Sequence, residues 1–158
     1  MPSIVYLSLG TNLGEKERNI KNALVAISKR IGHVLDCSSN YENPAWGFDS
    51  ENTFLNIVVK IETRLSAQAV LAEILCIEKK LGRTEKTKNG RYCDRIIDID
   101  ILFFDHEIIN SENLKIPHPL LAERMFVLKP LCEIAPDFIH PVLQKSTKEL
   151  YSNLLKCI

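Results

Sequence analysis

Residues 54–82 read FLNIVVKIETRLSAQAVLAEILCIEKKLG, and two different hydrophobic periods meet in this stretch. Over 54–63 the apolar residues Ile57, Val59 and Ile61 fall on alternate positions, which is typical of a β-strand. Over 66–81 the apolar positions are three and four residues apart, which predicts an amphipathic helix. These helical positions are Val70, Ile74, Ile77 and Leu81, with Ser66 as the expected N-cap and Gly82 at the end. The stretch therefore predicts a strand followed directly by a helix.

The same two periods recur upstream of this stretch. A continuous β-prone run over 4–9 predicts a central strand, and a helical spacing follows over 15–31. Asn12 and Glu15 have the spacing of a capping box in front of that helix. A second β-prone run over 34–41 predicts another strand. Strand, helix and strand thus precede the strand–helix pair.

Downstream, residues 96–104 predict a further strand, and short helices are expected over 120–124 and from 147 to the C-terminus. The element order is strand, helix, strand, strand, helix, strand. This order predicts an α+β fold with a ferredoxin-like split βαβ antiparallel sheet. Both helices would pack on one face, and the C-terminal helical elements would cover the other. We expect a single domain over 1–158.

Composition limits the classes of function. The chain has 158 residues, of which 46% are hydrophobic, and 20 lysines and arginines balance 20 acidic residues. A neutral chain is a poor candidate for non-specific binding to nucleic acid or to a membrane. Its five cysteines form no CxxC pair, which argues against a zinc site or a disulfide framework. No signal peptide or membrane span is visible, so we expect a cytoplasmic monomer with free thiols.

Two aspartates interrupt the apolar strand over 96–104. Because strand side chains alternate, Asp98 and Asp100 project from the same face, with Cα atoms about 6.5–7 Å apart. Burial and mutual repulsion would penalise both charges, and a hard cation between them would remove both penalties. Magnesium takes carboxylate oxygens and keeps positions open for phosphate oxygens. The alternative is a solvent-facing strand side with two acids of no special function.

A strongly basic segment leads into this aspartate pair. Residues 79–95 contain seven lysines and arginines but two acids, a net charge of +5 in a neutral chain. Cations beside metal-binding carboxylates indicate a magnesium–polyphosphate site, to which His118 and Arg124 could add donors. A solvated loop is the alternative. The chain has no G-x-x-x-x-G-K-[ST] motif, so a P-loop enzyme is excluded.

A third feature is a group of aromatic and amide side chains that could bind a flat heterocycle. Asparagines would bond to the edge of the ring and aromatic side chains would stack on its faces. Plain core packing is the alternative. The group consists of Asn43, Pro44, Trp46, Phe48, Phe54, Asn56 and Phe126.

Eight segments together carry a resemblance to a known family. They are Leu9–Gly14, Tyr41–Trp46, Phe54–Asn56, Ile77–Arg83, Arg95–Ile101, Ile116–Pro119, Arg124–Phe126 and Pro130–Pro136. Over nearly its whole length the chain resembles the 6-hydroxymethyl-7,8-dihydropterin pyrophosphokinase family. The resemblance implies transfer of pyrophosphate from ATP to the pterin, giving the pterin diphosphate and AMP, in folate biosynthesis.

The resemblance also implies site residues and two magnesium ions. Asp98 and Asp100 would hold the metal and, with Arg83 and Arg95, form the catalytic set. The implied ATP-binding residues are Glu78, Arg83, Arg91, Tyr92, Arg95, Ile101, His118 and Arg124. The implied pterin-binding residues are Asn43, Pro44, Trp46, Phe54, Asn56 and Phe126, and loops over 43–53 and 83–94 would close over the substrates. Tyr92 stands where many members carry tryptophan, and its loop is slightly longer than in the best-known members.

Two other functions remain open from the residues. A non-catalytic ferredoxin-like module that binds a ligand or RNA is one, although RNA binding requires exposed aromatics on the central strands. Asp98 and Asp100 occupy that place here and would repel a phosphate backbone. A two-metal nucleotidyl transferase is the other, and it would release pyrophosphate in place of AMP.

Overall fold

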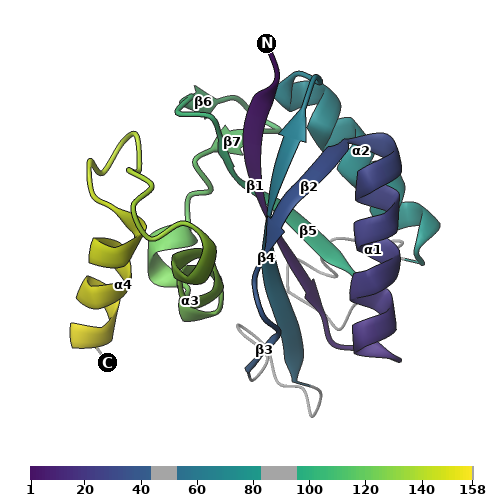
Figure 1. Cartoon of the computed structure of the whole chain (residues 1–158), viewed down its shortest axis with the longest axis horizontal. Coiled ribbons are helices and arrows are strands. Elements are labelled where there is room, and N and C mark those ends of the chain that lie inside the picture. Colours follow the sequence, from purple (N-terminus) through teal and green to yellow (C-terminus); the bar gives the residue numbers. More distant parts are fainter. Residues whose placement is uncertain (44–52, 83–95, 158) are drawn as a thin grey trace.

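In a computed structural model of the chain, residues 1–43, 53–82 and 96–157 are described. The elements are β1 (Ser3–Thr11), α1 (Lys16–Arg30), β2 (Gly32–Cys37), β3 (Tyr41–Asn43), β4 (Phe54–Thr63), α2 (Ala67–Lys80), β5 (Asp98–Phe104), β6 (Ile109–Asn110), β7 (Lys115–Ile116), the 3-10 helix η1 (Leu121–Glu123), α3 (Met125–Ile134) and α4 (Thr147–Lys156). Within these residues the strands form an antiparallel sheet in the order β2-β4-β1-β5, with β3 paired to β4 (Figure 1). A small β6–β7 sheet lies apart from it.

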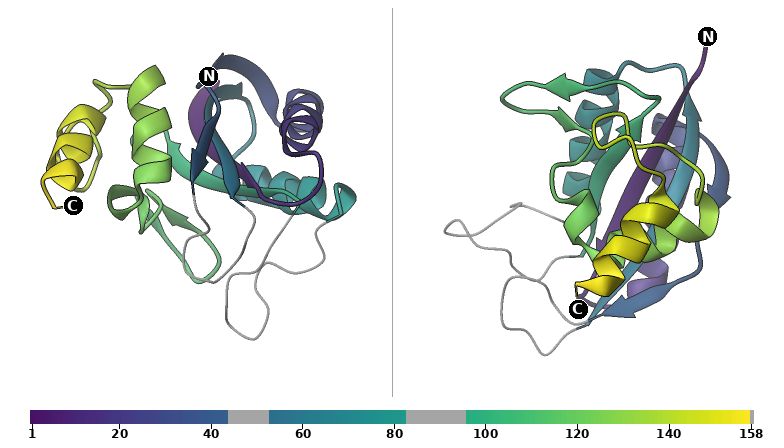
Figure 2. Two further views of the ribbon diagram at one scale, coloured as in Figure 1. Left: turned by 90° about the horizontal axis from the view of Figure 1, so that it is seen from below. Right: turned by 90° about the vertical axis from the view of Figure 1, so that its left-hand side faces the viewer.

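Helices cover both faces of the main sheet. On one face α1 and α2 pack side by side, and Ile27 and Ile74 join Leu7 of β1 in one core (Figure 1). On the other face α3 packs against the sheet and α4 packs against α3, and Leu131 of α3 and Leu150 of α4 share a second core with Tyr6 of β1 (Figures 1 and 2). The predicted mixture of an antiparallel sheet with helices is confirmed. Among the described helices, none has the length and apolar character needed to cross a membrane.

A β-bulge decides which way the side chains of β5 point. Tyr6 pairs with Phe103, but Leu7 pairs with Ile101, so Leu102 is an extra residue in the ladder. Ile99 and Ile101 consequently join the core under α1 and α2, whereas Leu102 and Phe103 join the core under α3 and α4. Because side chains alternate along a strand, Asp98 and Asp100 lie on the α3 side of the sheet.

The N-terminal half differs from the sequence prediction in two places. The strand predicted over 34–41 is divided into β2 and β3, because Ser38 leaves the strand geometry and its Oγ accepts the N–H of Val58 at 3.0 Å. The predicted capping box of α1 is wrong: Glu15 is the N-cap residue, and no side chain caps the helix. Ser66, in contrast, caps α2 as expected, by accepting the N–H of Ala69.

The sequence prediction also missed α3, the helix that covers the second face. The sequence predicts a short helix over 120–124, where the structure has the 3-10 helix η1, and α3 follows directly after it. Pro130 lies inside α3 and cannot donate a hydrogen bond to the carbonyl of Phe126. It is itself buried, as are Val127, Leu128 and Leu131, so packing against the sheet offsets the missing bond.

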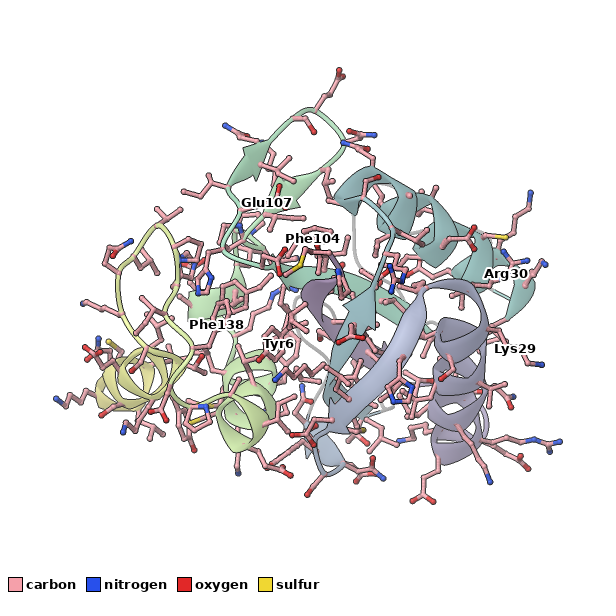
Figure 3. The ribbon with its side chains drawn as sticks, turned by 45° about the horizontal axis from the view of Figure 1, so that its top comes forward. Tyr6, Lys29, Arg30, Phe104, Glu107 and Phe138 are labelled. Atoms are coloured by element: carbon pink, nitrogen blue, oxygen red, sulfur yellow. The ribbon has the colours of Figure 1, made fainter. Side chains whose placement is uncertain are left out.

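The segment between α3 and α4 is attached to the sheet by aromatic contacts. The Phe138 ring lies 5.3 Å from that of Tyr6 and 4.4 Å from that of Phe103, between ring centroids. Figure 3 shows Phe138 and Tyr6 near each other. His106 stacks on Phe138 at 4.6 Å. Beyond it, Ser146 begins α4 with a full capping box. These contacts fix the C-terminal layer on the sheet.

Candidate active site

One row of residues runs straight across the sheet on the α3 side. Gly10 of β1 pairs with Asp98 of β5 on one side and with Asn56 of β4 on the other. Asn56 in turn pairs with Tyr41 of β3. Residues from four strands, far apart in the sequence, therefore lie side by side. Between the carboxylate of Asp98 and the amide of Asn56 lies Gly10, which has no side chain.

Gly10 leaves room between these two groups. A Cβ atom at this position would lie 2.8 Å from Oδ1 of Asn56 and 3.5 Å from Cδ1 of Phe54. Carbon and oxygen atoms do not approach to 2.8 Å without displacement, so only glycine fits while Asn56 keeps its orientation. The amide of Asn56 and the ring of Phe54 thus both border the space above Gly10.

The amide groups of this region are joined to each other. Nδ2 of Asn56 donates a hydrogen bond to Oδ1 of Asn43, and Asn43 pairs with Phe54 across the β3–β4 ladder. The helix α3, which carries Phe126, packs against both β3 and β4. The guanidinium carbon of Arg124 lies 5.5 Å from the centre of the Phe126 ring. The structure therefore brings Asn43, Phe54 and Asn56 together, and it places Phe126 on a helix that packs against the same two strands.

Asp100 lies at the edge of the sheet and faces His118. Its Oδ2 atom is 3.9 Å from Nε2 of His118, and each side chain is 19% exposed. Nδ1 of His118 accepts the N–H of Leu120 at 3.1 Å, so a neutral ring carries its proton on Nε2, toward Asp100. The backbone N–H of His118 donates to the carbonyl of Leu102, the bulge residue. The bulge thus positions the histidine next to the carboxylate.

Glu78 lies behind the aspartate pair. It is 3% exposed, and its Oε2 atom accepts the N–H of Ile99 at 2.8 Å. Ile99 is the residue between Asp98 and Asp100, so this bond holds the backbone from which both carboxylates project. The resemblance assigned Glu78 to ATP binding, and the contact shown here is with the strand.

A cleft follows the free edge of β5, between α2 and the β6–β7 hairpin. Its polar end contains Asp100 and His118. Its full lining is Leu71, Ile74, Ile99, Asp100, Ile101, Asn113, Leu114, Lys115, His118 and Pro119. Ile101 and His118 were expected at a nucleotide site. Leu71, Asn113 and Lys115 were not, because nothing local in the sequence indicates that the hairpin folds back beside α2.

The two aspartates suit a magnesium ion that is shared with a phosphate. No group of three or more histidine, cysteine, aspartate or glutamate side chains that could hold a metal occurs within residues 1–43, 53–82 and 96–157. Magnesium is characteristically bound by one or two carboxylates together with waters and substrate phosphates. A pair of carboxylates beside a cleft fits this pattern. The thiols that fall in the same ranges are free, at Cys37, Cys76, Cys132 and Cys157.

Several predicted site residues lie outside the described residues. They are Pro44 and Trp46 of the predicted pterin set, and Arg83, Arg91, Tyr92 and Arg95 of the predicted ATP and catalytic sets. Most of the basic segment over 79–95 and most of both predicted closing loops also fall there.

Comparison with known proteins agrees with this geometry. Residues 6–136 match the family model described as 7,8-dihydro-6-hydroxymethylpterin-pyrophosphokinase (HPPK). The chain is 44% identical over 140 residues to the 2-amino-4-hydroxy-6-hydroxymethyldihydropteridine pyrophosphokinase of Porphyromonas gingivalis, covering 88% of this chain and 95% of that protein. It is 41% identical over 152 residues to the folic acid synthesis protein FOL1 of Dictyostelium discoideum, covering 96% of this chain but 22% of that protein.

A solved structure shares the fold. The Plasmodium falciparum HPPK-DHPS wild type with pteroate superposes with a TM-score of 0.79 at 17% identity, over 99% of this chain and 45% of that one. The family match and the curated relatives define a transferase of the pyrophosphokinase class. The chain belongs to the 7,8-dihydro-6-hydroxymethylpterin-pyrophosphokinase family. The predicted activity, pyrophosphoryl transfer to a hydroxymethyldihydropterin in folate biosynthesis, is thereby confirmed.

Proposed function

We propose that the hydroxymethyl oxygen of 6-hydroxymethyl-7,8-dihydropterin attacks the β-phosphorus of ATP above Gly10, releasing AMP. The observation that carries this proposal is the row Asp98–Gly10–Asn56, which sets a heterocycle-binding amide and a phosphate-binding carboxylate on the two strands that flank β1. Such an arrangement favours transfer by holding both reactants in line at close range.

The pterin binds on the β3–β4 side of this row. Asn56 and Asn43 bond to the edge of the ring, and Phe54 and Phe126 stack on its faces. The contact between Asn56 and Asn43, and the nearness of Phe54 to Gly10, support this assignment. Pro44 and Trp46, next along the chain from Asn43, complete the pocket. Leaving the ring's polar edge unpaired would cost affinity, which makes the two amides the specificity groups.

Asp98 and Asp100 would hold two magnesium ions on the other side of the row. When bound, magnesium neutralises polyphosphate charge and lowers the pKa of a coordinated hydroxyl group. Glu78 keeps the carboxylates in place through the N–H of Ile99. His118, whose Nε2 faces Asp100, donates to a phosphate oxygen there. The position of both carboxylates on the α3 side supports this role.

ATP binds along the edge of β5. The adenine lies against the apolar part of the cleft, at Leu71, Ile74 and Leu114, and the phosphates extend toward Asp100 and His118. Ile101 lines the cleft as well, so it contacts the nucleotide. Arg124 contributes from the start of α3. Arg83, Arg91, Tyr92 and Arg95 supply further nucleotide contacts, with Arg83 and Arg95 neutralising charge on the group in transfer.

The finer structural predictions remain proposals. The sheet order β2-β4-β1-β5, with both crossover helices on one face, supports a ferredoxin-like split βαβ arrangement. We propose one domain over 1–158 that acts as a monomer in the cytoplasm. Free thiols among the described cysteines are consistent with a reducing compartment.

Product analysis tests the proposed function. The protein is incubated with magnesium, ATP and hydroxymethyldihydropterin, and the nucleotide products are separated. We expect AMP and the pterin diphosphate in equal amounts. Pyrophosphate with an adenylylated pterin would establish a nucleotidyl transferase, and pterin binding without ATP turnover would establish a binding module. Chelation of magnesium is the control.

A further inference from the structure

Glu133 lies on α3, away from the proposed metal and nucleotide residues, and it belongs to the Pro130–Pro136 segment that carries part of the family resemblance. Its carboxylate accepts three kinds of hydrogen bond from one short segment. Both oxygens lie 3.0 Å from the N–H of Ser39, Oε2 accepts from Oγ of Ser39 at 3.0 Å, and Oε1 accepts from the hydroxyl of Tyr41 at 2.6 Å. We call this group the Glu133 clasp.

The clasp acts on β3, which is three residues long and is paired with β4. Lys129, one turn before Glu133 on α3, places its Nζ atom 5.5 Å from the centre of the Tyr41 ring. Tyr41 is therefore held both at its hydroxyl and over its ring by the same helix. Three residues of ladder give little intrinsic stability. The position of β3 consequently depends on α3.

The helix α3 contacts both sides of the proposed pterin pocket: it carries Phe126, and through Glu133 it holds β3. Phe126 and Glu133 are seven residues apart on α3, which puts them on one side of the helix about 10 Å apart. At one end of that side is the aromatic residue proposed to stack on the pterin. At the other end the clasp holds Tyr41, which lies opposite Asn56 and two residues before Asn43.

We propose that Glu133 is a positioning residue for the pterin: through Ser39 and Tyr41 it sets the distance between Phe126 and the amides of Asn43 and Asn56. This inference rests on the proposed function, because it assigns these amides to the pterin edge. It predicts that loosening β3 widens the pocket and weakens pterin binding while nucleotide binding along β5, at the opposite edge of the sheet, is unaffected.

The hydrogen bonds that Glu133 accepts from Tyr41 and Ser39 are of a strong kind, which is consistent with a rigid clasp. Hydrogen bonds from Tyr41 and Ser39 lower the pKa of Glu133 below its usual value, so the carboxylate is charged at neutral pH. Charge-assisted hydrogen bonds are shorter and stronger than neutral ones, and the 2.6 Å contact with Tyr41 is of this kind.

The test compares Glu133→Gln, Tyr41→Phe and the double variant in the full-length chain. Calorimetry measures Kd for hydroxymethyldihydropterin and, separately, for a non-hydrolysable ATP analogue with magnesium. We expect each single change to weaken pterin binding about tenfold, through the lost charge-assisted bond, with ATP-analogue binding within twofold of wild type. The double variant should resemble Glu133→Gln, because that change already weakens the contact that Tyr41→Phe removes.

Glu73→Gln is the matched control. It makes the same carboxylate-to-amide change in a residue that joins two other elements, since Arg30 of α1 donates a hydrogen bond to Glu73 of α2 at 2.8 Å. Figure 3 shows Arg30 on the side of the sheet away from α3. It should leave both affinities at the wild-type value. Thermal unfolding shows whether each variant is folded. If Glu133→Gln folds poorly, Tyr41→Phe still tests the clasp, because it removes a single oxygen atom.

The binding results distinguish a failure of the Glu133 clasp from a failure of the proposed function. Wild-type protein that binds pterin, with folded clasp variants that bind it equally well, would overturn the clasp alone. Equal losses for pterin and nucleotide would also overturn it, because they indicate a general structural effect. Wild-type protein that binds no pterin would overturn the proposed function, and the clasp with it.

Discussion

Gly10 of β1 lies directly opposite Asn56 of β4, and a Cβ atom at Gly10 would come within 2.8 Å of the Asn56 amide oxygen. This pair explains why the residue between the aspartate and the amide carries no side chain. A methyl group would have to displace Asn56 from its bond with Asn43. The relationship connects a glycine in the first strand to the orientation of Asn56, the residue that we propose binds the edge of the pterin.

Gly10→Ala is therefore expected to weaken pterin binding by tenfold or more, roughly the effect of leaving one buried amide unpaired. Binding of an ATP analogue should change little, since the nucleotide cleft follows β5. Calorimetry with each ligand measures both. A variant that binds pterin normally would contradict the placement of the ring above Gly10.

Asn56→Ala should also weaken pterin binding, because it removes the amide itself. Asn56 is 3% exposed, and its removal leaves the polar edge of the pterin without its partner. An unpaired buried group costs about 1–3 kcal/mol, which corresponds to roughly 5- to 150-fold in Kd. The measurement is Kd for pterin against Kd for the ATP analogue. Equal losses for the two ligands would remove Asn56 from the pterin site.

Asp98→Asn and Asp100→Asn should each reduce turnover by two orders of magnitude or more. Metal stabilisation of charge in phosphoryl chemistry is worth several kcal/mol, and each 1.4 kcal/mol is about tenfold in rate. Steady-state turnover is measured against magnesium concentration, with thermal unfolding as the check on folding. Asp137→Asn, an exposed carboxylate paired with Lys148 at 3.8 Å, is the matched control and should be silent. Near-normal turnover at saturating magnesium would make the aspartate pair a plain polar strand face.

The ionisation of Tyr41 should report the Glu133 contact directly. The hydrogen bond to Glu133 raises the pKa of the Tyr41 phenol to about 12, because the neighbouring carboxylate favours the protonated hydroxyl. Stability from this raised pKa is complete below the phenol's usual pKa of 10 and is lost as pH rises through about 12. The lowered pKa of Glu133 adds stability above 4.5 that is lost as pH falls.

Ultraviolet absorbance of tyrosinate, titrated against pH, measures this effect. Subtracting the titration of Tyr41→Phe isolates the Tyr41 signal in the wild type. In Glu133→Gln the midpoint should move down toward 10, because an amide does not stabilise the phenol proton as a carboxylate does. The same midpoint with and without the Glu133 carboxylate would show that the contact does not control Tyr41.

Local periodicity was enough to predict most of the elements and part of the site. The helical spacing over 66–81 and the alternation over 54–63 correspond closely to α2 and β4, because hydrophobic period reflects which side of each element is buried. The alternation of β5 also placed Asp98 and Asp100 on one face, since that relationship depends on neighbouring residues in one strand.

Tertiary structure alone decided which distant residues meet. The register that puts Gly10 between Asp98 and Asn56 joins strands separated by more than 40 residues, and no local pattern encodes it. The bulge at Leu102, the fold of the hairpin that brings Lys115 to the cleft, and the contact of Glu133 with Tyr41 depend on pairing and packing between elements. The helix α3 exists despite Pro130 because burial against the sheet outweighs one missing backbone bond, a balance that only the packed chain can settle.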